Sequence, residues 1–407
     1  MEPNHSLQVA RKAAGFTRER LADILGVSAT TVYRWERGKH IPDPYVQRRL
    51  SKLLQLPGQA FGTYERKEEP CLRESLPFLI DPCLPSSQPT LIGQHLLLKE
   101  MGRTSRPMIG ITGLPGSGKS ALAQALTGLP TLRQEVEGIF WACVGPQPNH
   151  LRHLQRWLLL LGEEHMPEQM EEAQDRLQLL LRGREMLIVL DDLWQVEDML
   201  PYQFPRCRYI LTTRFPIVAN TVCDRVYCPC LLTEPQAFQL LSQSLPASLA
   251  QEHREILRAL CHQVGFLPLA IEHIGKYLRR EARSASQRRF QEALTHLFEP
   301  ASYLRLQMVP TSFSLATSLK QSEAWLSSAA QQAFSALATH LPVAPLAFSE
   351  RQVTNLIQTS GQFHLQDLDQ LVDYGLLSTI GRNQYQIHPV VAAYARLQAE
   401  TEPEITE

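Results

Sequence analysis

A glycine-rich stretch that ends in a lysine and a serine offers the clearest chemistry in this sequence of 407 residues. It reads Gly-Leu-Pro-Gly-Ser-Gly-Lys-Ser over residues 113–120, between an apolar segment at 107–112 and a helical pattern at 121–126. Glycines let successive backbone N–H groups turn inward, and the start of the following helix adds positive potential. A strand, this loop and a helix, in that order, predict a site for the phosphates of ATP or ADP.

Each polar residue of the loop has an expected part in holding phosphates. Lys119 is expected to reach the β- and γ-phosphates, and the hydroxyl of Ser120 is expected to coordinate Mg²⁺. The other loop residues that we expect to bind the nucleotide are Gly113, Pro115, Gly116, Ser117, Gly118 and Ala121.

Two acidic residues follow another apolar strand pattern, and their position indicates a place for a metal ion and a water molecule. Carboxylates at the C-terminal end of a parallel strand face the ligand crevice of an α/β sheet. Asp191 is the expected partner of Mg²⁺, and Asp192 is placed to orient a water molecule. A further strand at 208–213 delivers Arg214 to the same edge, where its guanidinium can sense or stabilise a γ-phosphate. With an apolar segment at 138–144, these patterns predict a parallel α/β sheet.

The first 57 residues carry a separate signal, an excess of positive charge. They hold ten Lys and Arg residues against five acidic residues, about +5 in a chain whose net charge is −1. This asymmetry indicates a polyanionic partner. Helical patterns with a break at 15–17, where Thr17 can cap the next helix, predict a bundle in which Val32 and Trp35 face inward. The outward residues expected to contact DNA are Ser28, Ala29, Thr30, Tyr33, Arg34 and Arg37.

This N-terminal module resembles the Cro/phage-repressor helix-turn-helix family. The resemblance is carried by Thr-Arg-Glu-Arg-Leu-Ala at 17–22, Leu-Gly-Val-Ser at 25–28 and Thr-Val-Tyr-Arg-Trp-Glu-Arg-Gly at 31–38. It makes DNA the expected partner of residues 6–57. The alternative is a small helical protein-interaction domain whose arginines are merely solvated.

Composition places the chain as a whole among globular proteins. Hydrophobic residues make up 44% and charged residues 20%, and no apolar run approaches the ~20 residues of a membrane span. The N-terminus lacks the layout of a signal peptide, so a cytoplasmic protein is expected. Eight cysteines include no Cys-x-x-Cys pair, and we expect buried, reduced thiols rather than a zinc site.

From about residue 90 to 399 the order of motifs resembles the NB-ARC class of signal-transduction ATPases. Ile92-Gly93-Gln94 is similar to that family's adenine-side motif, with glutamine where the family usually has arginine. Arg214 matches the sensor arginine of the family, and Pro268 matches a proline that packs on adenine. His388 stands in Ile-His-Pro where the family has Met-His-Asp, and the family histidine touches the β-phosphate of ADP.

The expected fold is multidomain. An all-α helix-turn-helix bundle precedes a P-loop α/β parallel-sheet domain, a small helical domain and a winged-helix domain, the last indicated by helices around a hairpin pattern at 376–386. The expected boundaries are 1–60 for the helix-turn-helix, 61–90 for a proline-rich linker, 91–230 for the nucleotide-binding domain, 231–305 for the helical domain, 306–400 for the winged helix and 401–407 for a tail.

The resemblance implies a molecular switch rather than a metabolic enzyme. ADP would hold a closed form, ATP would favour self-association, slow hydrolysis would reset the switch, and DNA binding would be the output of this transcriptional regulator. The alternative is a signalling or antiphage-defence scaffold in which the N-terminal module binds protein. A metabolic NTPase or kinase is disfavoured, because no motif for a second substrate is visible. Relatives usually continue into sensor repeats, so sensing falls to a separate partner protein, to the winged helix and linker, or to a part beyond this sequence.

Overall fold

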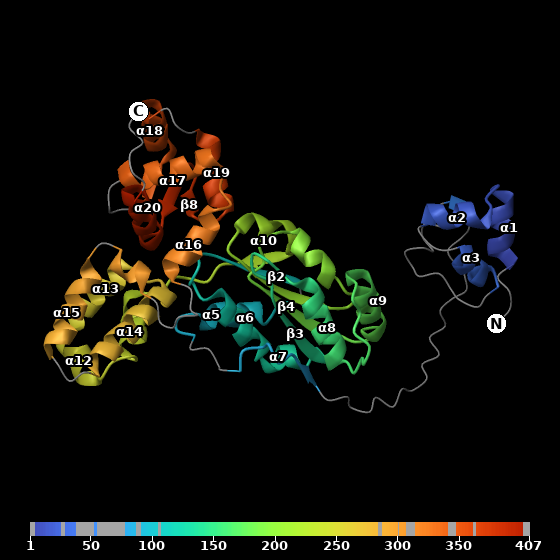
Figure 1. Ribbon diagram of the computed structural model, residues 1–407, viewed down its shortest axis with the longest axis horizontal. Helices are drawn as coiled ribbons and strands as arrows, with labels where there is room; N and C mark the ends of the chain where they lie inside the picture. The colour runs from blue at the N-terminus through green and yellow to red at the C-terminus, as the bar shows by residue number, and fades with distance from the viewer. Residues whose placement is uncertain are drawn as a thin grey trace. The chain divides into compact units, whose positions relative to one another are not determined.

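The computed structural model forms two compact units, Met1–Leu76 and Pro77–Glu407, which are described separately (Figure 1). Ser28, most of the predicted linker and nearly all of the tail lie outside the described residues. None of the described helices is long and apolar enough to cross a membrane. The residues that the structure describes are 5–25, 29–37, 53–54, 78–86, 91–104, 107–283, 287–299, 301–306, 314–340, 347–360 and 364–401.

In its described residues, the N-terminal unit contains three short helices, α1 (His5–Ala13), α2 (Arg18–Leu25) and α3 (Ala29–Glu36). Thr17 begins α2 as its sequence predicts, because its hydroxyl accepts a hydrogen bond from the backbone N–H of Arg20 at 3.1 Å. The inward residues Val32 and Trp35 are buried, as expected. They share a small core with Leu7, Leu21, Ala22 and Leu54.

A buried carboxylate joins α1, α2 and α3. Glu36 accepts hydrogen bonds from the Nε atoms of Arg11 and Arg18, each at 2.6 Å. Both Arg11 and Glu36 are buried, whereas the side chain of Arg18 is partly exposed. A buried charge is stable only when it is paired, so Arg11 and Arg18 serve the internal structure of the unit.

The second unit is built on a six-stranded sheet with the strand order β1-β3-β4-β5-β2-β6. Every neighbouring pair in this sheet is parallel. The strands are β1 (Leu79–Ile80), β2 (Met108–Thr112), β3 (Gly138–Cys143), β4 (Met186–Asp191), β5 (Arg208–Thr213) and β6 (Arg225–Tyr227). The parallel α/β sheet expected from the apolar segments is therefore present.

Alternate residues of the strands build separate cores on the two faces of the sheet. In β4, Met186, Ile188 and Leu190 pack on one face, with side chains of α8 (His150–Leu160), α9 (Met170–Leu180) and α10 (Pro216–Val222). Leu187 and Val189 pack on the other face, with α5 (His95–Met101), α6 (Lys119–Thr127) and α7 (Pro130–Arg133). Strands buried on both faces read as continuous apolar runs, which explains why the sequence signals them strongly.

The first strand, β1, lies inside the segment that was predicted to be a linker. Residues 61–90 were expected to connect domains, but Leu79 and Ile80 pair with Gly138 and Ile139 at the edge of the sheet. Asp81 follows the strand and is completely buried. Its carboxylate accepts hydrogen bonds from the backbone N–H of Trp141, the indole of Trp157 and the guanidinium of Arg156. A buried carboxylate with these partners fixes the strand to the sheet.

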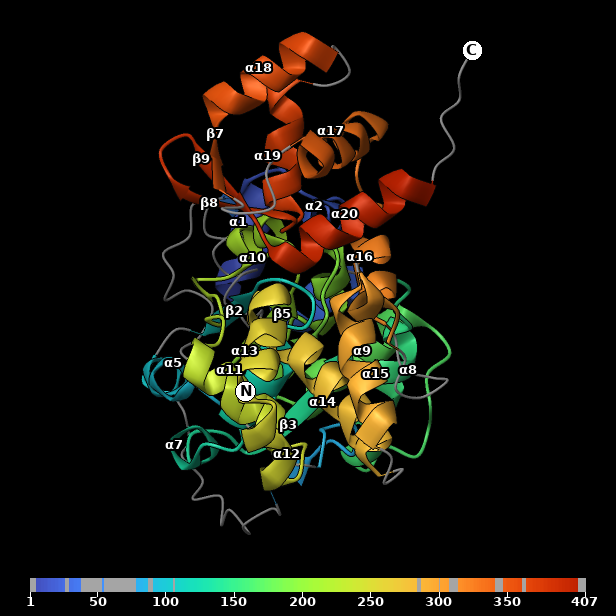
Figure 2. The same cartoon turned by 90° about the vertical axis from the view of Figure 1, so that its left-hand side faces the viewer.

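The rest of this unit is mostly helical and shares one continuous core. Figures 1 and 2 show α12–α15 gathered in one group and α17–α20 in another around the strands β8 and β9. The first group contains α11 (Glu234–Ser242), α12 (Ala247–Glu252), α13 (Arg254–Gln263), α14 (Pro268–Ala282), α15 (Gln287–Phe298) and the 3-10 turn η3 (Ser302–Arg305).

The C-terminal group combines helices with a small antiparallel sheet of order β7-β9-β8. The hairpin expected over 376–386 is confirmed as β8 and β9, with Asn383 at positive φ in the turn. Its elements are α16 (Leu315–Glu323), α17 (Ser328–His340), β7 (Ala347–Ser349), α18 (Glu350–Ser360), α19 (Leu365–Asp373), β8 (Leu377–Gly381), β9 (Gln384–Ile387) and α20 (Pro389–Thr401).

Candidate nucleotide-binding site

The glycine-rich loop connects β2 to α6, as its sequence predicts. Gly113, Gly116 and Gly118 have φ angles of 145°, 82° and 96°, a region that favours glycine. Apart from Gly118 and its neighbours in the chain, nothing lies within 4 Å of the point where a Cβ of Gly118 would stand, so this backbone borders open space. Ser117 is buried, and its hydroxyl has no hydrogen-bond partner. The loop therefore borders open space at Gly118 and holds a hydroxyl group, that of Ser117, without a hydrogen-bond partner.

Lys119 is the first residue of α6 and is buried within the loop. Its ammonium donates hydrogen bonds to the carbonyl oxygens of Gly113 and Leu114, at 2.9 and 2.8 Å. Burial, and secondarily the positive charge of Arg214, lower the pKa of Lys119 to about 8. The side chain lies inside the loop, where an added negative charge would stabilise its protonated form.

Asp191 ends β4, and its carboxylate is held by two hydroxyl groups. Ser120 donates to its Oδ1 atom at 2.7 Å, and Thr212 of the neighbouring strand β5 donates to the same atom at 2.6 Å. Burial raises the pKa of Asp191 above its usual value, although the two hydrogen bonds act in the opposite direction. The structure therefore brings together the two residues that the sequence assigned to Mg²⁺.

Asp192 and Arg214 form an ion pair at the same sheet edge. The Nη2 atom of Arg214 lies 3.2 Å from Oδ1 of Asp192, and the guanidinium lies 4.4 Å from the ring centre of Trp194. The Nη1 atom of Arg214 donates to the carbonyl oxygen of Ser318 at 2.9 Å and to the hydroxyl of Ser322 at 3.3 Å. One arginine therefore connects the acidic end of β4 to α16.

His388 precedes α20 and contacts the turn before α14. Val390 donates its backbone N–H to Nδ1 of His388 at 3.2 Å, so Nδ1 is an acceptor and Nε2 carries the proton. That Nε2 atom donates to the carbonyl oxygen of Gly265 at 3.0 Å. Burial lowers the pKa of His388 to about 4, so the imidazole is neutral near pH 7. An apolar hollow beside His388 also includes Leu114 and Pro115 of the glycine-rich loop.

The predicted adenine-side residues lie between the sheet and the helical groups. Ile92 packs against the core shared by those groups. Gly93 has a φ of 77° and faces Gln236 of α11, whereas Gln94 hydrogen-bonds to the backbone carbonyl of Cys230. Pro268 begins α14, and the backbone N–H of the next residue, Leu269, donates to the carbonyl oxygen of Gly116.

These residues fit a phosphate group and a divalent cation. The loop offers positive-φ glycines beside open space and the unpartnered hydroxyl of Ser117, which suit phosphate oxygens. Ser120 and Asp191 offer neighbouring hard oxygen ligands. No group of three His, Cys, Asp or Glu that could hold a metal occurs in the described part of the chain. Mg²⁺ suits such a pair, because it usually binds one or two protein oxygens together with phosphates and water.

Sequence reasoning missed several residues at this site. Thr212 bridges Asp191 to the backbone N–H of Asp192, and the motif at the end of β5 marked only its arginine. Ser318 and Ser322 carry no recognisable motif. Cys228 lies against the loop, with its Sγ 3.3 Å from the point where a Cβ of Gly113 would stand. The expectation of buried thiols is wrong for Cys228 and also for Cys83, Cys143 and Cys230, which are exposed.

In the N-terminal unit, four predicted DNA-contacting residues are exposed. Thr30, Tyr33 and Arg34 lie on α3, and Arg37 follows it. The guanidinium groups of Arg18 and Arg37 lie 5.1 and 5.6 Å from the ring centre of Tyr33.

Comparison with known proteins agrees with this geometry. Residues 92–248 match the NB-ARC domain family, and residues 7–61 match a helix-turn-helix family. The chain carries an NB-ARC domain. This NB-ARC domain, with the phosphate loop and the acidic strand end described above, is a nucleotide-binding module of the P-loop type. It follows an N-terminal helix-turn-helix domain.

The chain is also similar to plant proteins. The chain is 31% identical over 210 residues to the probable disease resistance protein RF45 of Arabidopsis thaliana, covering 47% of this chain and 21% of that protein. It is 27% identical over 198 residues to disease resistance protein RPP13 of Arabidopsis thaliana, covering 44% of this chain and 24% of that protein. The match therefore spans about a fifth to a quarter of these relatives.

A solved structure shares the fold beyond the NB-ARC domain. The Walker-type ATPase PABY2304 of Pyrococcus abyssi aligns with a TM-score of 0.50 at 13% identity, covering 77% of this chain and 99% of that chain. At this identity the likeness concerns the fold alone.

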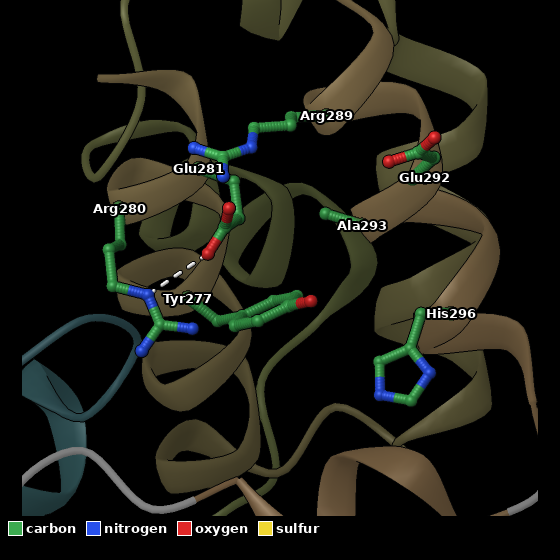
Figure 3. Close-up of a pocket in the computed structure, with 7 residues that line it drawn as sticks. All are labelled: Tyr277, Arg280, Glu281, Arg289, Glu292, Ala293 and His296. Carbon is green, nitrogen blue, oxygen red and sulfur yellow. Dashed lines mark hydrogen bonds and ion pairs between the residues drawn. The ribbon is translucent and has the colours of Figure 1, made fainter. Parts of the chain in front are cut away.

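A groove of about 550 Å³ lies between α14 and α15, toward the C-terminal end of α14 (Figure 3). Figure 3 shows Arg280 paired with Glu281, with the ring of Tyr277 beside them and His296 on the facing helix. The P-loop instead contacts the first turn of α14. The groove is therefore separate from the nucleotide site.

Proposed function

We propose that this chain is a nucleotide-controlled switch that couples bound ADP or ATP to self-association and DNA binding. Its NB-ARC domain would hold the nucleotide, with Mg²⁺ between Ser120, Asp191 and the phosphates. When bound, the metal ion would neutralise phosphate charge. Asp192 would orient water for slow hydrolysis that resets the switch. The helix-turn-helix at residues 6–57 would deliver the output.

The observation that carries this proposal is that Arg214 contacts both the acidic end of β4 and helix α16. Its guanidinium contacts Asp192 on the nucleotide side and Ser318 and Ser322 on α16. A γ-phosphate beside Lys119 would compete for the same guanidinium, and the contacts with α16 would be lost. A ligand shifts a conformational equilibrium only through different affinities for the two states, and this arginine supplies such a difference.

His388 would act as a second contact of the closed form. It ties the start of α20 to Gly265, which precedes α14, and it lies near Leu114 and Pro115 of the phosphate loop. We propose that residues 306–400 are a winged-helix domain that closes over ADP through His388 and the adenine-packing Pro268. Pro389 stands where the family has an aspartate. The hydrogen-bond partner of His388 is the carbonyl oxygen of Gly265.

The DNA surface of this proposal is the exposed side of α3. Thr30, Tyr33 and Arg34 present hydroxyl and guanidinium groups that suit base edges and phosphates. Arg37 adds positive charge at the end of the helix. Ser28 and Ala29 stay predicted contacts at its start. Self-association would join several such surfaces and raise the affinity for DNA through valency.

The experiment compares the purified chain in ADP and in a non-hydrolysable ATP analogue, both with Mg²⁺. Light scattering measures mass, and selection from random DNA followed by a gel shift measures DNA affinity. We expect a larger mass and tighter DNA binding with the ATP analogue. Lys119→Ala is the control that should abolish the response to nucleotide. The same mass and affinity in both nucleotides would show that the chain is not such a switch.

A signalling or antiphage-defence scaffold is the second candidate, and the named disease resistance relatives favour it. In this function the N-terminal unit would bind protein, and clustering itself would be the output. Random-sequence selection separates the two candidates. Recovery of a paired half-site supports the transcriptional switch, whereas nucleotide-dependent assembly without any recovered DNA motif supports the scaffold.

A further inference from the structure

The thiol of Cys228 lies against the first glycine of the phosphate loop. Cys228 is exposed, and its Sγ atom is 3.3 Å from the point where a Cβ of Gly113 would stand. Its S–H group donates a weak hydrogen bond to the carbonyl oxygen of Pro229 at 3.8 Å. Cys228 therefore combines access to solvent with a position at the edge of the nucleotide site.

The register of the sheet explains the position of this thiol. Strand β6 pairs in parallel with β2, and the last of these pairs joins Ile111 to Tyr227. One residue further along both strands, Cys228 follows β6 and Thr112 ends β2, directly before Gly113. Side chains at neighbouring positions of parallel strands lie on the same face of the sheet. The register thus places the thiol beside the start of the phosphate loop.

Two buried hydroxyl groups without hydrogen-bond partners lie at the same place. Ser117 is only 4% exposed, and its Oγ atom is 3.2 Å from the same Cβ point of Gly113 that Cys228 approaches. Thr112 is also buried, and its Oγ1 atom has no partner. Buried polar groups without partners cost free energy, which a bound polar group would recover. The space beside Gly113 therefore suits a ligand with polar groups.

The positive charge of Lys119 acts on this thiol. Burial of the sulfur raises the pKa of Cys228, and the charge of Lys119 opposes that increase. The ammonium group of Lys119 also donates to the carbonyl oxygen of Gly113, the glycine beside the thiol. A negatively charged group attached to Cys228 would therefore compete with phosphate for Lys119.

We propose that Cys228 is a covalent control site of nucleotide binding, modified by a small disulfide that carries carboxylate groups. The proposal rests on the proposed nucleotide function and adds a means of regulation to it. The Cys228 thiolate attacks one sulfur of the disulfide, the S–S bond of the small molecule breaks, and a new S–S bond joins one half to Cys228. The other half leaves as a thiolate and takes up the proton that Cys228 lost. The small disulfide is thus the oxidant, and an added thiol reverses the step.

The attached group and the nucleotide exclude each other. Polar atoms of the attached group pair with the hydroxyls of Ser117 and Thr112, and its carboxylates pair with Lys119. The phosphates of a nucleotide need the same ammonium group, so modification weakens nucleotide binding. Bound phosphates in turn cover the loop beside Cys228 and slow its modification.

The experiment treats the full chain with glutathione disulfide, with and without ADP and Mg²⁺, and locates the adducts by fragment mass spectrometry. ADP at about ten times its dissociation constant leaves about a tenth of the sites free, so modification of Cys228 should slow about tenfold. Calorimetry on the modified chain should show an ADP affinity lower by about tenfold or more, because a charged contact is lost. Dithiothreitol should restore the affinity.

A neighbouring thiol provides a matched control. Cys230 is also exposed and lies two residues further along the chain. Cys230→Ser should lose ADP affinity on treatment as the native sequence does, whereas Cys228→Ser should have the same ADP affinity before and after treatment. Each variant is compared with its own untreated sample, so any effect of the substitution itself on binding or folding cancels.

Four results would overturn the inference alone. They are the absence of an adduct on Cys228, modification at the same rate with and without ADP, an unchanged ADP affinity after modification of Cys228, and an equal loss of affinity on treatment of Cys228→Ser. Failure of the untreated, reduced chain to bind any adenine nucleotide would instead overturn the proposed function, and this inference with it.

Discussion

The backbone N–H of Leu269 donates a hydrogen bond to the carbonyl oxygen of Gly116 at 3.2 Å. The first turn of α14 is thereby attached directly to the phosphate loop. A Cβ on Gly116 would stand 2.7 Å from the Cβ of Leu269, and the φ of Gly116 is 82°. The absence of a Cβ at Gly116 thus allows the close approach of α14 as well as the positive φ of the loop.

Gly116→Ala should destabilise this unit more than backbone strain alone would. Positive φ costs an alanine about 1–2 kcal/mol, and the contact with Leu269 should add roughly 1–3 kcal/mol. Gly145→Ala is the matched control, because Gly145 has a φ of 67° and nothing within 4 Å of its Cβ position. Denaturant unfolding of both variants measures the difference, and equal losses would show that α14 moves away freely.

Arg214→Met should loosen α16 from the nucleotide side of the sheet. The variant loses the contacts with Asp192, Ser318 and Ser322, and hydrogen exchange in α16 should become faster in ADP. Arg208→Met is the control, because Arg208 begins the same strand and pairs with Glu135 at the surface. Such an exposed pair contributes at most about 1 kcal/mol. Unchanged exchange in Arg214→Met would remove the basis of the proposed coupling.

The pH dependence of stability should report the contact between His388 and Gly265. The folded chain holds the pKa of His388 at about 4, below its ordinary value of 6.5. Between pH 6.5 and about pH 4, His388 is protonated in the unfolded chain but neutral in the folded chain. Stability therefore falls as the pH falls through this window, by at most about 3 kcal/mol.

His388→Gln isolates this effect. Glutamine can still donate to the carbonyl of Gly265 but does not titrate. His153 also has a pKa lowered to about 4 by burial, so both chains share its contribution. Unfolding free energies measured at pH 7 and pH 5 should therefore decrease less in the variant than in the unmodified chain. Equal decreases in the two chains would contradict the burial of a neutral His388.

Glu36→Gln should unfold or loosen the N-terminal unit while leaving nucleotide binding unchanged. The change leaves the buried Arg11 without a counter-charge, which typically costs about 3–5 kcal/mol. Proteolysis of the N-terminal unit, followed by mass spectrometry, measures the effect. Glu100→Gln is the control, because Glu100 pairs with Arg225 at the surface. Resistance of Glu36→Gln equal to that of the control would show that the pairing is dispensable.

The sequence predicted the strands that are buried on both faces and lead to the site. Their apolar runs are long, and the phosphate loop has a fixed spacing, so β2, β4 and β5 and the residues after them were placed correctly. Strand β1 escaped prediction because two residues have no periodicity, and prolines at 77 and 82 suggested a linker. Three partners that hold the Asp81 carboxylate, on Trp141, Arg156 and Trp157, lie 60 to 76 residues further along the chain.

The sequence also could not predict which backbone carbonyl groups the site side chains contact. Gln94 bonds to the carbonyl of Cys230, His388 to that of Gly265, and Arg214 to that of Ser318. A carbonyl acceptor is present at every residue, so no side-chain pattern marks which one is used. The motifs could identify these three side chains as important, but only tertiary packing determines their partners.

The burial of Asp81 has a mechanical consequence. The chain that arrives from the helix-turn-helix enters the second unit at β1, and Asp81 fastens that entry to β3 and α8 through Trp141, Arg156 and Trp157. Strand β3 pairs along its whole length with β4, so that Cys143 lies opposite Asp191. A pulling force on the N-terminal unit would therefore be borne by the strand next to β4, which ends in Asp191, the carboxylate that we propose binds Mg²⁺.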